Sequence, residues 1–350
     1  MIEPNLVRLL DANANRAREG LRSAEDYARF IVGTGRWYGR LKQARHRLTE
    51  LLTAHPGNEV WAAARRVQSD LGNPEQVETL PAPGGGEPTR EVALRGLKRA
   101  QEALRALEEY TRAGFGELSR DLSKLRYGAY EAEQWLVQGS DRSRALNRAK
   151  LYVLLCEEDC ALGLEGTARA ALEGGAEILQ LREKRLEGAA ILERARRLRE
   201  VCAERGALLV VNDRVDVALA AEADGAHLGQ KDLPPADARR QTGPGVLLGR
   251  STHTLEQARR ALEEDVDYLA VGAMYATETK AGYTLAGPGL AREVAALGAD
   301  RPVFAIGGIT AARAAELKRA GIGRVAVGKA VCAAKDPCAA AAALRAALEQ

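Results

Sequence analysis

Residues 178–184 read Ile-Leu-Gln-Leu-Arg-Glu-Lys, and this stretch decides how the rest of the chain is interpreted. It is typical of a β-strand, along which side chains alternate between two faces. Gln180, Arg182 and Lys184 therefore share one face, and the two leucines take the other. An amide and two cations on one face suit an anionic ligand such as a phosphate or diphosphate. The alternative is that these three side chains meet solvent at a strand end.

Seven further strand-like runs share the C-terminal two-thirds of the chain with this one, and helical segments rich in Ala, Arg and Glu alternate with them. The eight runs are Leu151–Leu155, Ile178–Arg182, Leu208–Asn212, Gly225–Leu228, Val246–Arg250, Tyr268–Gly272, Val303–Ile306 and Arg324–Val327. Eight strand–helix units in about 200 residues predict an α/β fold, a (β/α)8 TIM barrel. An open doubly wound sheet is the alternative, but it normally has fewer strands, and no GxGxxG motif follows the first strand.

Polar residues and glycines follow nearly every predicted strand, at the end where such barrels carry their active sites. In chain order they are Gln180, Arg182, Lys184, Asn212, Asp213, Asp232, Ser251, Thr277, Glu278, Thr279, Lys280, Gly307, Gly308, Gly328 and Lys329. The barrel interior is normally filled with branched apolar side chains, and such local rules tend to be broken at functional sites. The sequence therefore predicts that these residues converge on one rim of the barrel.

Each of these features has a structural alternative. Asp213, Asp232 and Ser251 could be helix caps. Two aspartates at the ends of adjacent strands, beside a cationic site, instead favour Mg²⁺, which takes one or two carboxylates together with substrate phosphate oxygens. The glycines suit tight turns or a phosphate held by backbone N–H groups. His227 and His253 lack a third ligand for zinc, and His227 is interpreted as a structural histidine.

The N-terminal part of the chain, residues 1–145, has no strand pattern and is rich in Leu, Ala, Arg and Glu at helical spacing. It contains an internal repeat, because residues 16–29 match residues 99–112. A second helix is expected after each copy, over Tyr38–Leu52 and over Leu118–Leu136. The prediction is an all-helical domain of two related hairpins packed face to face.

Each copy of the repeat carries a charged stripe on one helical face, with Glu25 in the first copy and Glu108 in the second. One interpretation is a solvated face with ion pairs. The other is an Arg-rich groove between the paired helices that holds a phosphorylated small molecule. The breaker-rich stretch over residues 72–86 is interpreted as a loop between the copies. The sequence contains no Walker-type GxxxxGK[ST] motif, so it indicates no ATP site.

Length and composition set further limits. The 350 residues predict two domains, over residues 1–145 and 146–350. A net charge of +3, spread along the chain, argues against a nucleic-acid or membrane surface. The start lacks a signal-peptide core, and no apolar run is long enough to span a bilayer. Five cysteines without zinc-type spacing are typical of reduced thiols, so a cytoplasmic protein is expected, and homo-oligomerisation is compatible with the sequence.

Residues from about 150 to 345 closely resemble the thiamine phosphate synthase family. The motifs that carry the resemblance lie at residues 180–184, 211–214, 224–230, 251–253, 277–280 and 305–309. The resemblance implies a transferase that joins hydroxymethylpyrimidine diphosphate to a thiazole (carboxythiazole) phosphate, giving thiamine phosphate and diphosphate. Mg²⁺ would assist departure of diphosphate, and the thiazole nitrogen would attack the pyrimidine CH₂ cation.

The resemblance also implies a role for each matching position. The catalytic residues would be Arg182, Lys184, Ser251 and Lys280. The substrate-binding residues would be Gln180, Leu181, Arg182, Glu183, Lys184, Asn212, Ser251, Thr277, Glu278, Thr279, Lys280, Gly308, Gly328 and Lys329. Asp213 and Asp232 would bind Mg²⁺. The family often has Ser or Arg where this chain has Gly328-Lys329-Ala330. The backbone N–H donors are expected to remain at this position, whereas the contact that a Ser or Arg side chain would make is not expected.

Residues 5–137, with Asp-Ala-Asn-Ala-Asn-Arg-Ala-Arg-Glu-Gly-Leu-Arg at 11–22, resemble the helical domain found ahead of some thiamine phosphate synthases. That domain family is associated with a hydroxymethylpyrimidine phosphate kinase activity, and an oligomerisation module is the alternative. For the barrel, the alternatives are a thiazole tautomerase-like relative without diphosphate chemistry and a non-catalytic binder of phosphorylated metabolites. Retention of Asp213 and Asp232 beside the cationic face favours the synthase.

Overall fold

A computed structural model describes residues 4–54, 88–112, 114–276, 286–297 and 301–349 of the chain. The chain divides into two compact units, Met1–Val137 and Gln138–Gln350. The boundary expected at residues 145/146 falls inside helix α6 (Ser140–Arg148), which belongs to the second unit. The loop expected over residues 72–86 lies outside the described residues.

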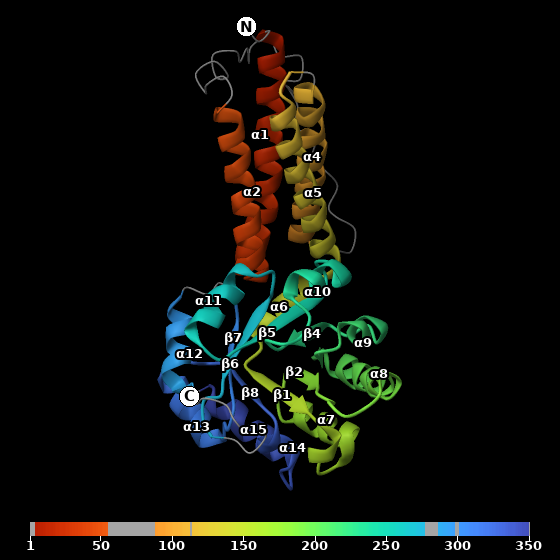
Figure 1. The fold of residues 1–350 in the computed structure, drawn as a ribbon, viewed down its shortest axis with the longest axis vertical. Helices are drawn as coiled ribbons and strands as arrows, with labels where there is room; N and C mark the ends of the chain where they lie inside the picture. Colours follow the sequence, from red (N-terminus) through yellow and green to blue (C-terminus); the bar gives the residue numbers. More distant parts are fainter. Residues whose placement is uncertain (1–3, 55–87, 113, 277–285, 298–300, 350) are drawn as a thin grey trace. The chain divides into compact units, whose positions relative to one another are not determined.

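The described part of the second unit is a closed barrel of eight parallel strands in sequence order (Figure 1). The strands are β1 (Leu151–Leu155), β2 (Ile178–Leu181), β3 (Leu208–Asn212), β4 (Gly225–Leu228), β5 (Leu247–Thr252), β6 (Tyr268–Gly272), β7 (Val303–Ile306) and β8 (Val325–Val327). The predicted TIM barrel is confirmed, and the main difference in bounds is β5, which continues through Thr252.

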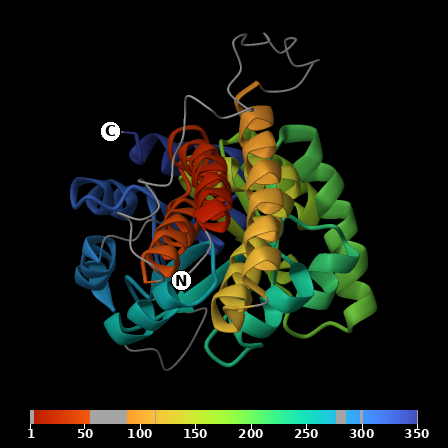
Figure 2. The ribbon, with the colours of Figure 1, turned by 90° about the horizontal axis from the view of Figure 1, so that it is seen from above.

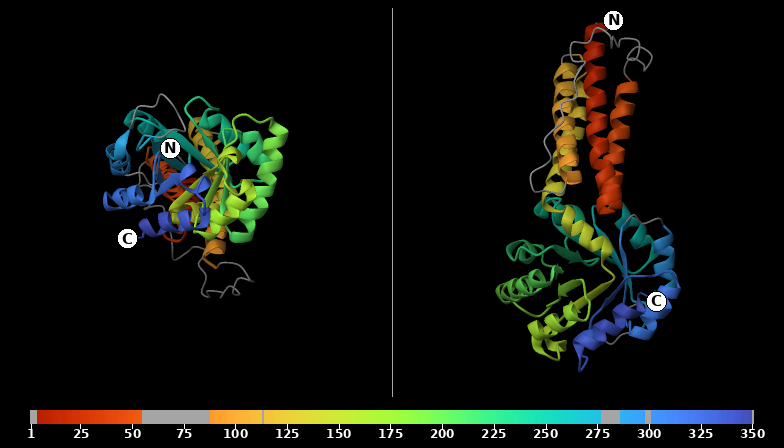
Figure 3. Two further views of the ribbon diagram at one scale, coloured as in Figure 1. Left: turned by 90° about the horizontal axis from the view of Figure 1, so that it is seen from below. Right: turned by 180° about the vertical axis from the view of Figure 1, so that it is seen from behind.

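Helices follow the strands around the outside of the barrel. They are η3 (Glu157–Asp159), α7 (Gly163–Glu173), α8 (Gly188–Arg205), α9 (Val215–Ala220), α10 (Pro235–Thr242), α11 (Leu255–Glu263), α12 (Gly287–Ala296), α13 (Ala311–Arg319), α14 (Lys329–Cys332) and α15 (Pro337–Ala347). Seen from above, the helices of the first half of the barrel (green) lie on one side and those of the second half (blue) on the other (Figure 2). The last helix, α15, packs between α13 and α7 and closes the ring (Figure 3).

Two apolar layers stabilise the barrel, and the alternation of each strand decides which residues enter which layer. The inner layer contains Tyr152, Ile178, Leu208, Val210, Leu247, Tyr268, Phe304 and Ala326. Helix α6 adds Leu146 to this layer, and Ala149 follows directly after the helix. The outer layer lies between strands and helices and includes Leu179 and Leu181. Gln180 is only 2% exposed, so the predicted orientation of strand β2 is confirmed.

The described part of the first unit is all helical. Helix α1 (Pro4–Asp26) continues into a π-helical segment η1 (Tyr27–Val32), and α2 (Gly35–Thr53) follows. After the gap come α4 (Pro88–Arg112) and α5 (Gly116–Gln138). The two second helices expected from the repeat lie within α2 and α5. Each described helix of the chain is too short or too polar to cross a membrane.

Helices α1 and α4 cross closely at two glycines. A Cβ atom on Gly20 would lie 2.2 Å from the carbonyl oxygen of Gly96, and one on Gly96 would lie 2.9 Å from that of Gly20. Glycine is required because backbone approaches backbone at this point. Buried alanines, including Ala17 and Ala100, continue the contact on both helices. The two copies of the repeat therefore pack together along their first helices.

Candidate active site

A cavity of about 490 Å³ opens at the carboxyl ends of the strands, and all eight strands contribute to its lining. Eight residues singled out from the sequence line it: Gln180, Arg182, Asn212, Ser251, Gly307, Gly308, Gly328 and Lys329. Their convergence follows from topology, because the carboxyl ends of parallel strands meet at one rim of a closed barrel.

Two amide side chains bring unsatisfied polar atoms to this cavity. Gln180 donates from Nε2 to the hydroxyl of Tyr152 at 2.6 Å, while its buried Oε1 has no hydrogen-bond partner within the described residues. The buried Nδ2 of Asn212 likewise lacks a partner there. Burying an unpaired amide atom costs free energy unless a ligand pairs with it. One acceptor and one donor are thus available for a polar heterocycle.

Cations and carboxylates gather at the ends of β2, β3 and β4. Lys184 Nζ lies 3.4 Å from Asp213 Oδ2. Burial raises the pKa of Asp213, and the neighbouring Asp232 carboxyl raises it further, whereas Lys184 opposes the shift. Arg182 lines the cavity and pairs with no carboxylate among the described residues. Two close carboxylates beside cationic side chains form a polar site suited to a divalent cation and an anion.

Asp213, Asp232 and Ser251 are not the N-cap residues of the helices that follow them. The N-cap of α9 is Arg214, that of α10 is Pro234, and that of α11 is Thr254. Asp213 has a left-handed backbone, with φ of +62°, which is uncommon for a residue other than glycine. Asp232 Oδ2 accepts a hydrogen bond from Gly229 N at 2.6 Å. The capping interpretation is therefore wrong for Asp213, Asp232 and Ser251.

Glycines after β7 bring backbone close to the cavity. Gly307 and Gly308 have φ of +105° and +64°. A Cβ atom on Gly308 would lie 2.6 Å from the carbonyl oxygen of Ala276. Helix α13 begins directly beyond, with Thr310 as its side-chain N-cap. An N-terminal helix end and nearby N–H groups form a favourable environment for an anion.

Arg313 is a cavity residue that the sequence interpretation missed. Its guanidinium donates to the carbonyl oxygen of Gly308 at 2.5 Å and lies over the Tyr275 ring, 4.5 Å from the ring centre. It lines the cavity from the first turn of α13. The available signal was a basic residue five positions after the Gly-Gly pair, on a helix whose N-terminus faces the rim.

Strand β8 leads directly into the remaining predicted residues. Gly328 is the N-cap position of the short helix α14, and Lys329 follows it. Lys329 Nζ lies 3.5 Å from Asp159 Oδ1, and both residues line the cavity. This ion pair partly neutralises the Lys329 charge, so the backbone of Gly328 remains the simpler anion contact.

Some predicted residues lie elsewhere. Leu181 is buried in the layer between strands and helices, and Glu183 accepts a hydrogen bond from Glu157 N at 2.8 Å; neither lines the cavity. Thr277, Glu278, Thr279 and Lys280 lie outside the described residues. Within the described ranges, no group of three or more His, Cys, Asp or Glu side chains could hold a metal. The proposed Mg²⁺ ligands Asp213 and Asp232 form a pair of neighbouring carboxylates.

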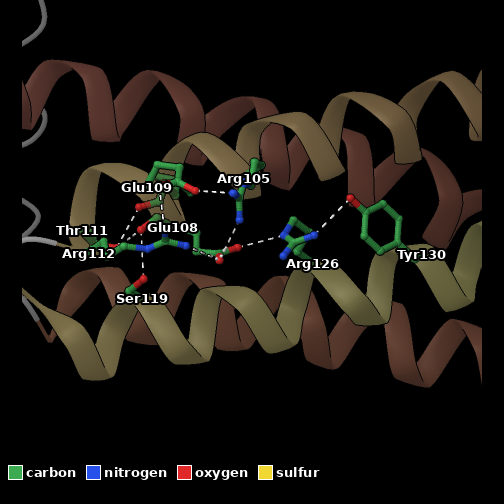
Figure 4. A network of polar contacts seen from close by, with 9 residues as sticks. Arg105, Glu108, Glu109, Thr111, Arg112, Ser119, Arg126 and Tyr130 are labelled. Atoms are coloured by element: carbon green, nitrogen blue, oxygen red, sulfur yellow. Dashed lines mark hydrogen bonds and ion pairs between the residues drawn. The ribbon is translucent and has the colours of Figure 1, made fainter.

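The charged stripes of the first unit form two matching clusters. Glu25 Oε2 lies 2.8 Å from Arg45 Nε in α2, and Glu25 Oε1 lies 3.3 Å from Arg22 on its own helix. Glu108 repeats this pattern, with Arg126 in α5 at 2.9 Å and Arg105 at 3.0 Å (Figure 4).

Both glutamates are buried, at 1% and 5% exposure. Burial alone would raise the pKa of Glu108, but the hydrogen bond and charge of Arg126, with Arg105 and Arg112, bring it below its usual value. Each stripe therefore ties the first helix of a hairpin to the second helix of the same hairpin. The ion pairs therefore have a structural role, because they join helices within each hairpin. The alternative of an Arg-rich ligand groove stays a prediction.

Comparison with known proteins agrees with this description. A family model described as thiamine monophosphate synthase matches residues 151–331, and one described as the ThiD2 family matches residues 8–135. A thiamine-phosphate synthase from Nostoc sp. is 38% identical over 340 residues, covering 96% of this chain and 92% of that protein. One from Gloeobacter violaceus is 40% identical over 335 residues, covering 96% and 94%. The solved thiamine phosphate pyrophosphorylase from Pyrococcus furiosus has 35% identity and a TM-score of 0.54, covering 58% of this chain and 96% of that chain.

Proposed function

The chain belongs to the thiamine monophosphate synthase family, and from this premise we propose that its barrel joins hydroxymethylpyrimidine diphosphate to a thiazole phosphate. The products are thiamine phosphate and diphosphate. The observation that carries the proposal is that Arg182 lines the cavity at the end of β2, as does Asn212 at the end of β3, and that Asp213, the residue after Asn212, contacts both Lys184 and Asp232. This set combines a binding site for a leaving diphosphate with one for its metal.

The residues suit a reaction in which diphosphate leaves before the new bond forms. The bond between the pyrimidine CH₂ and the diphosphate oxygen breaks, and its electron pair departs with diphosphate. The aminopyrimidine ring spreads the positive charge left on CH₂, and the thiazole nitrogen then donates its lone pair to form the C–N bond. Arg182 and Lys184 stabilise the departing anion electrostatically, which is often the largest catalytic contribution. We also propose that Ser251 and Lys280 act at the reacting centre, and that Thr277, Glu278 and Thr279 bind substrate.

The aspartate pair fits Mg²⁺. Asp213 and Asp232 supply two carboxylates, and the raised pKa of Asp213 reflects burial and repulsion that a divalent cation would relieve. Bound there, Mg²⁺ would supply charge neutralisation for the diphosphate.

The unsatisfied amide atoms suit the pyrimidine. Gln180 Oε1 can accept from an exocyclic amino group, and Asn212 Nδ2 can donate to a ring nitrogen. On the opposite side, Gly308, Gly328 and the start of α13 suit the phosphate of the thiazole partner. Arg313 adds a cation on that side. The cavity thus offers distinct surroundings to the two substrates.

The two alternatives for the barrel differ in their need for the metal site. A thiazole tautomerase-like relative would need no diphosphate or Mg²⁺ contacts, and a non-catalytic binder would show no turnover. The experiment is a synthase assay with hydroxymethylpyrimidine diphosphate and thiazole phosphate, with and without Mg²⁺. We expect Mg²⁺-dependent formation of thiamine phosphate with one diphosphate per product. Binding of both substrates without turnover would rule the proposal out.

For the first unit we propose a kinase that converts hydroxymethylpyrimidine phosphate to the diphosphate used by the barrel. The match of residues 8–135 to the ThiD2 family supports this, and an oligomerisation module is the alternative. The test supplies the full chain with hydroxymethylpyrimidine phosphate and thiazole phosphate. We expect thiamine phosphate only when ATP is added. No product with ATP, in a preparation that is active on the diphosphate, would leave the kinase assignment without support.

A further inference from the structure

Five hydrogen-bonded side chains form a continuous row across the interior of the barrel, and four of them line the cavity. Gln180 Nε2 lies 2.6 Å from Tyr152 Oη, which lies 2.9 Å from Tyr268 Oη. Tyr268 Oη lies 3.1 Å from His227 Nδ1, and His227 Nε2 lies 2.8 Å from Ser251 Oγ. The side chains come from β2, β1, β6, β4 and β5. The two ends, Gln180 and Ser251, line the cavity together with Tyr152 and His227, whereas Tyr268 does not line it.

The donor at the first link favours one direction for the other links. The Gln180 amide nitrogen can only donate, so the Tyr152 hydroxyl accepts there, and Tyr268 is its other hydrogen-bond partner, to which we assign the Tyr152 proton. Tyr268 then donates to His227 Nδ1, which must be the unprotonated nitrogen of a neutral ring. His227 Nε2–H donates to Ser251, and the Ser251 proton is left to point elsewhere. One end thus presents the Gln180 Oε1 acceptor, and the other presents a Ser251 O–H donor.

We propose that Tyr152, Tyr268 and His227 are positioning residues, which hold Gln180 as an acceptor for the substrate amino group and Ser251 as a donor to the leaving anion. The inference rests on the proposed synthase function, because that function defines the two groups to be recognised. It gives His227 a role beyond that of the structural histidine expected from the sequence. It also explains why the barrel interior, normally apolar, contains two tyrosines and a histidine.

Two features of the surroundings support this arrangement. Gly249 on β5 leaves the space that the Tyr268 and His227 side chains need, because a Cβ atom there would lie 2.1 Å from Tyr268 Cζ and 2.5 Å from His227 Nδ1. Burial raises the pKa of Tyr152, and that of Tyr268 well above its usual value. Both hydroxyls therefore keep their protons at neutral pH, as a directed chain requires.

The opposite direction is the competing arrangement. If the Gln180 amide were reversed, its oxygen would accept from Tyr152, His227 would carry its proton on Nδ1, and Ser251 would donate to His227. Ser251 would then direct its proton away from the cavity. The protonated nitrogen of His227 distinguishes the two directions, and it can be observed without any activity measurement.

The first test is nitrogen NMR of the full chain labelled with ¹⁵N-histidine. The chain contains four histidines, so a His227→Gln sample identifies the resonances of interest. We expect a neutral His227 with its proton on Nε2 near pH 7.5. A proton on Nδ1, or a doubly protonated ring, would overturn the proposed direction. Absence of synthase activity in the wild-type chain would refute the proposed function instead and would leave the tautomer result intact.

The second test is kinetic and uses Tyr268→Phe, which removes one hydroxyl and keeps the buried ring. We expect kcat to fall by about tenfold, the effect of about one hydrogen bond, with little change in KM. Ser251→Ala should lower kcat by about a hundredfold. If Tyr268 acts through Ser251, the double variant should match Ser251→Ala within about twofold. Multiplicative losses in the double variant would show that Tyr268 acts independently of Ser251 and would contradict the proposal.

A matched control comes from the same strand as Ser251. Thr252 is fully buried, and its Oγ1 donates to the carbonyl oxygen of Ala270 at 3.3 Å, outside the chain of five side chains. Thr252→Val therefore removes a buried hydroxyl while leaving the chain intact, and kcat should stay near the wild-type value. If Tyr268→Phe does not fold, Tyr152→Phe is the second variant, because it removes the hydroxyl that bonds Gln180 and Tyr268. That variant should raise KM for the pyrimidine diphosphate, and an unchanged KM would count against the role of Tyr152.

Discussion

Lys184 Nζ lies 3.4 Å from Asp213 Oδ2, although the two residues follow different strands of the barrel. The pair connects the cationic face of β2 with the carboxylates that follow β3 and β4. A cation and an acid in contact partly neutralise one another. Under the proposed function, diphosphate would bind Lys184 and Mg²⁺ would bind Asp213 in place of this contact.

Arg182→Ala and Lys184→Ala should each lower kcat/KM by about a hundredfold or more, because each removes charge that stabilises the leaving diphosphate. The measurement is steady-state release of diphosphate. Arg185→Ala is the matched control, since Arg185 is exposed at 84% and pairs with Glu158 at 3.1 Å. The control should keep wild-type kinetics. Similar losses in all three variants would indicate a general effect of charge rather than this site.

Removal of Mg²⁺ by a chelator should abolish thiamine phosphate formation, and added Mg²⁺ should restore it. Asp213→Ala should lower turnover by at least about a hundredfold. Asp232→Asn should raise the Mg²⁺ concentration needed for half-maximal rate, because it leaves one carboxylate at the site. A Mg²⁺ titration of the rate measures this shift. An unchanged titration curve in Asp232→Asn would place the metal elsewhere.

Gly308→Ala should raise KM for the thiazole phosphate by about tenfold or more, because a Cβ atom would lie 2.6 Å from Ala276 O and φ is +64°. Gly321→Ala serves as control for the backbone conformation alone. Gly321 has φ of +86°, but a Cβ atom on it would meet no heavy atom within 4 Å. The Gly321→Ala variant should have a lower melting temperature and an unchanged KM for the thiazole phosphate. Equal KM values in the two variants would argue against a phosphate contact at Gly308.

Glu108→Gln should destabilise the first unit at pH 7 by about 2 kcal/mol, because it removes the charge that Arg126 and Arg105 bind. The pKa of Glu108 lies below its usual 4.5 in the folded state. Its stabilising contribution is therefore complete above that pH and is lost as pH falls through the folded-state pKa. The difference between variant and wild type should disappear in acid.

Tryptophan fluorescence during urea unfolding is the appropriate measurement, because all three tryptophans, at 37, 61 and 135, lie in the first unit. Glu102→Gln is the matched control, since Glu102 is exposed on the same helix. The control should unfold like the wild type at every pH. A constant difference for Glu108→Gln from pH 7 to pH 3 would show that the charge of Glu108 does not stabilise the fold.

Much of the fold was predictable because its signals are local. Strand-like runs at regular spacing predict the eight strands of the barrel, and the repeat predicts two helices on each side of the gap. Helix α6 was missed because Ser-Asp-Arg-Ser-Arg-Ala-Leu-Asn-Arg is polar, and it is the barrel core that buries Leu146 beside Ala149. The extension of β5 through Thr252 was missed because pairing with β6, rather than local sequence, defines it.

By itself, the sequence determined which side chains leave each strand end, since alternation along a strand and the order of the strands are local properties. It therefore predicted the cationic face of Gln180, Arg182 and Lys184 and the aspartates that follow β3 and β4. Only the tertiary structure decided that Tyr152, Tyr268 and His227, buried on three different strands, form one hydrogen-bonded chain. It also brought Arg313 to the cavity. Such contacts depend on closure of the barrel, which places residues far apart in sequence at hydrogen-bonding distance.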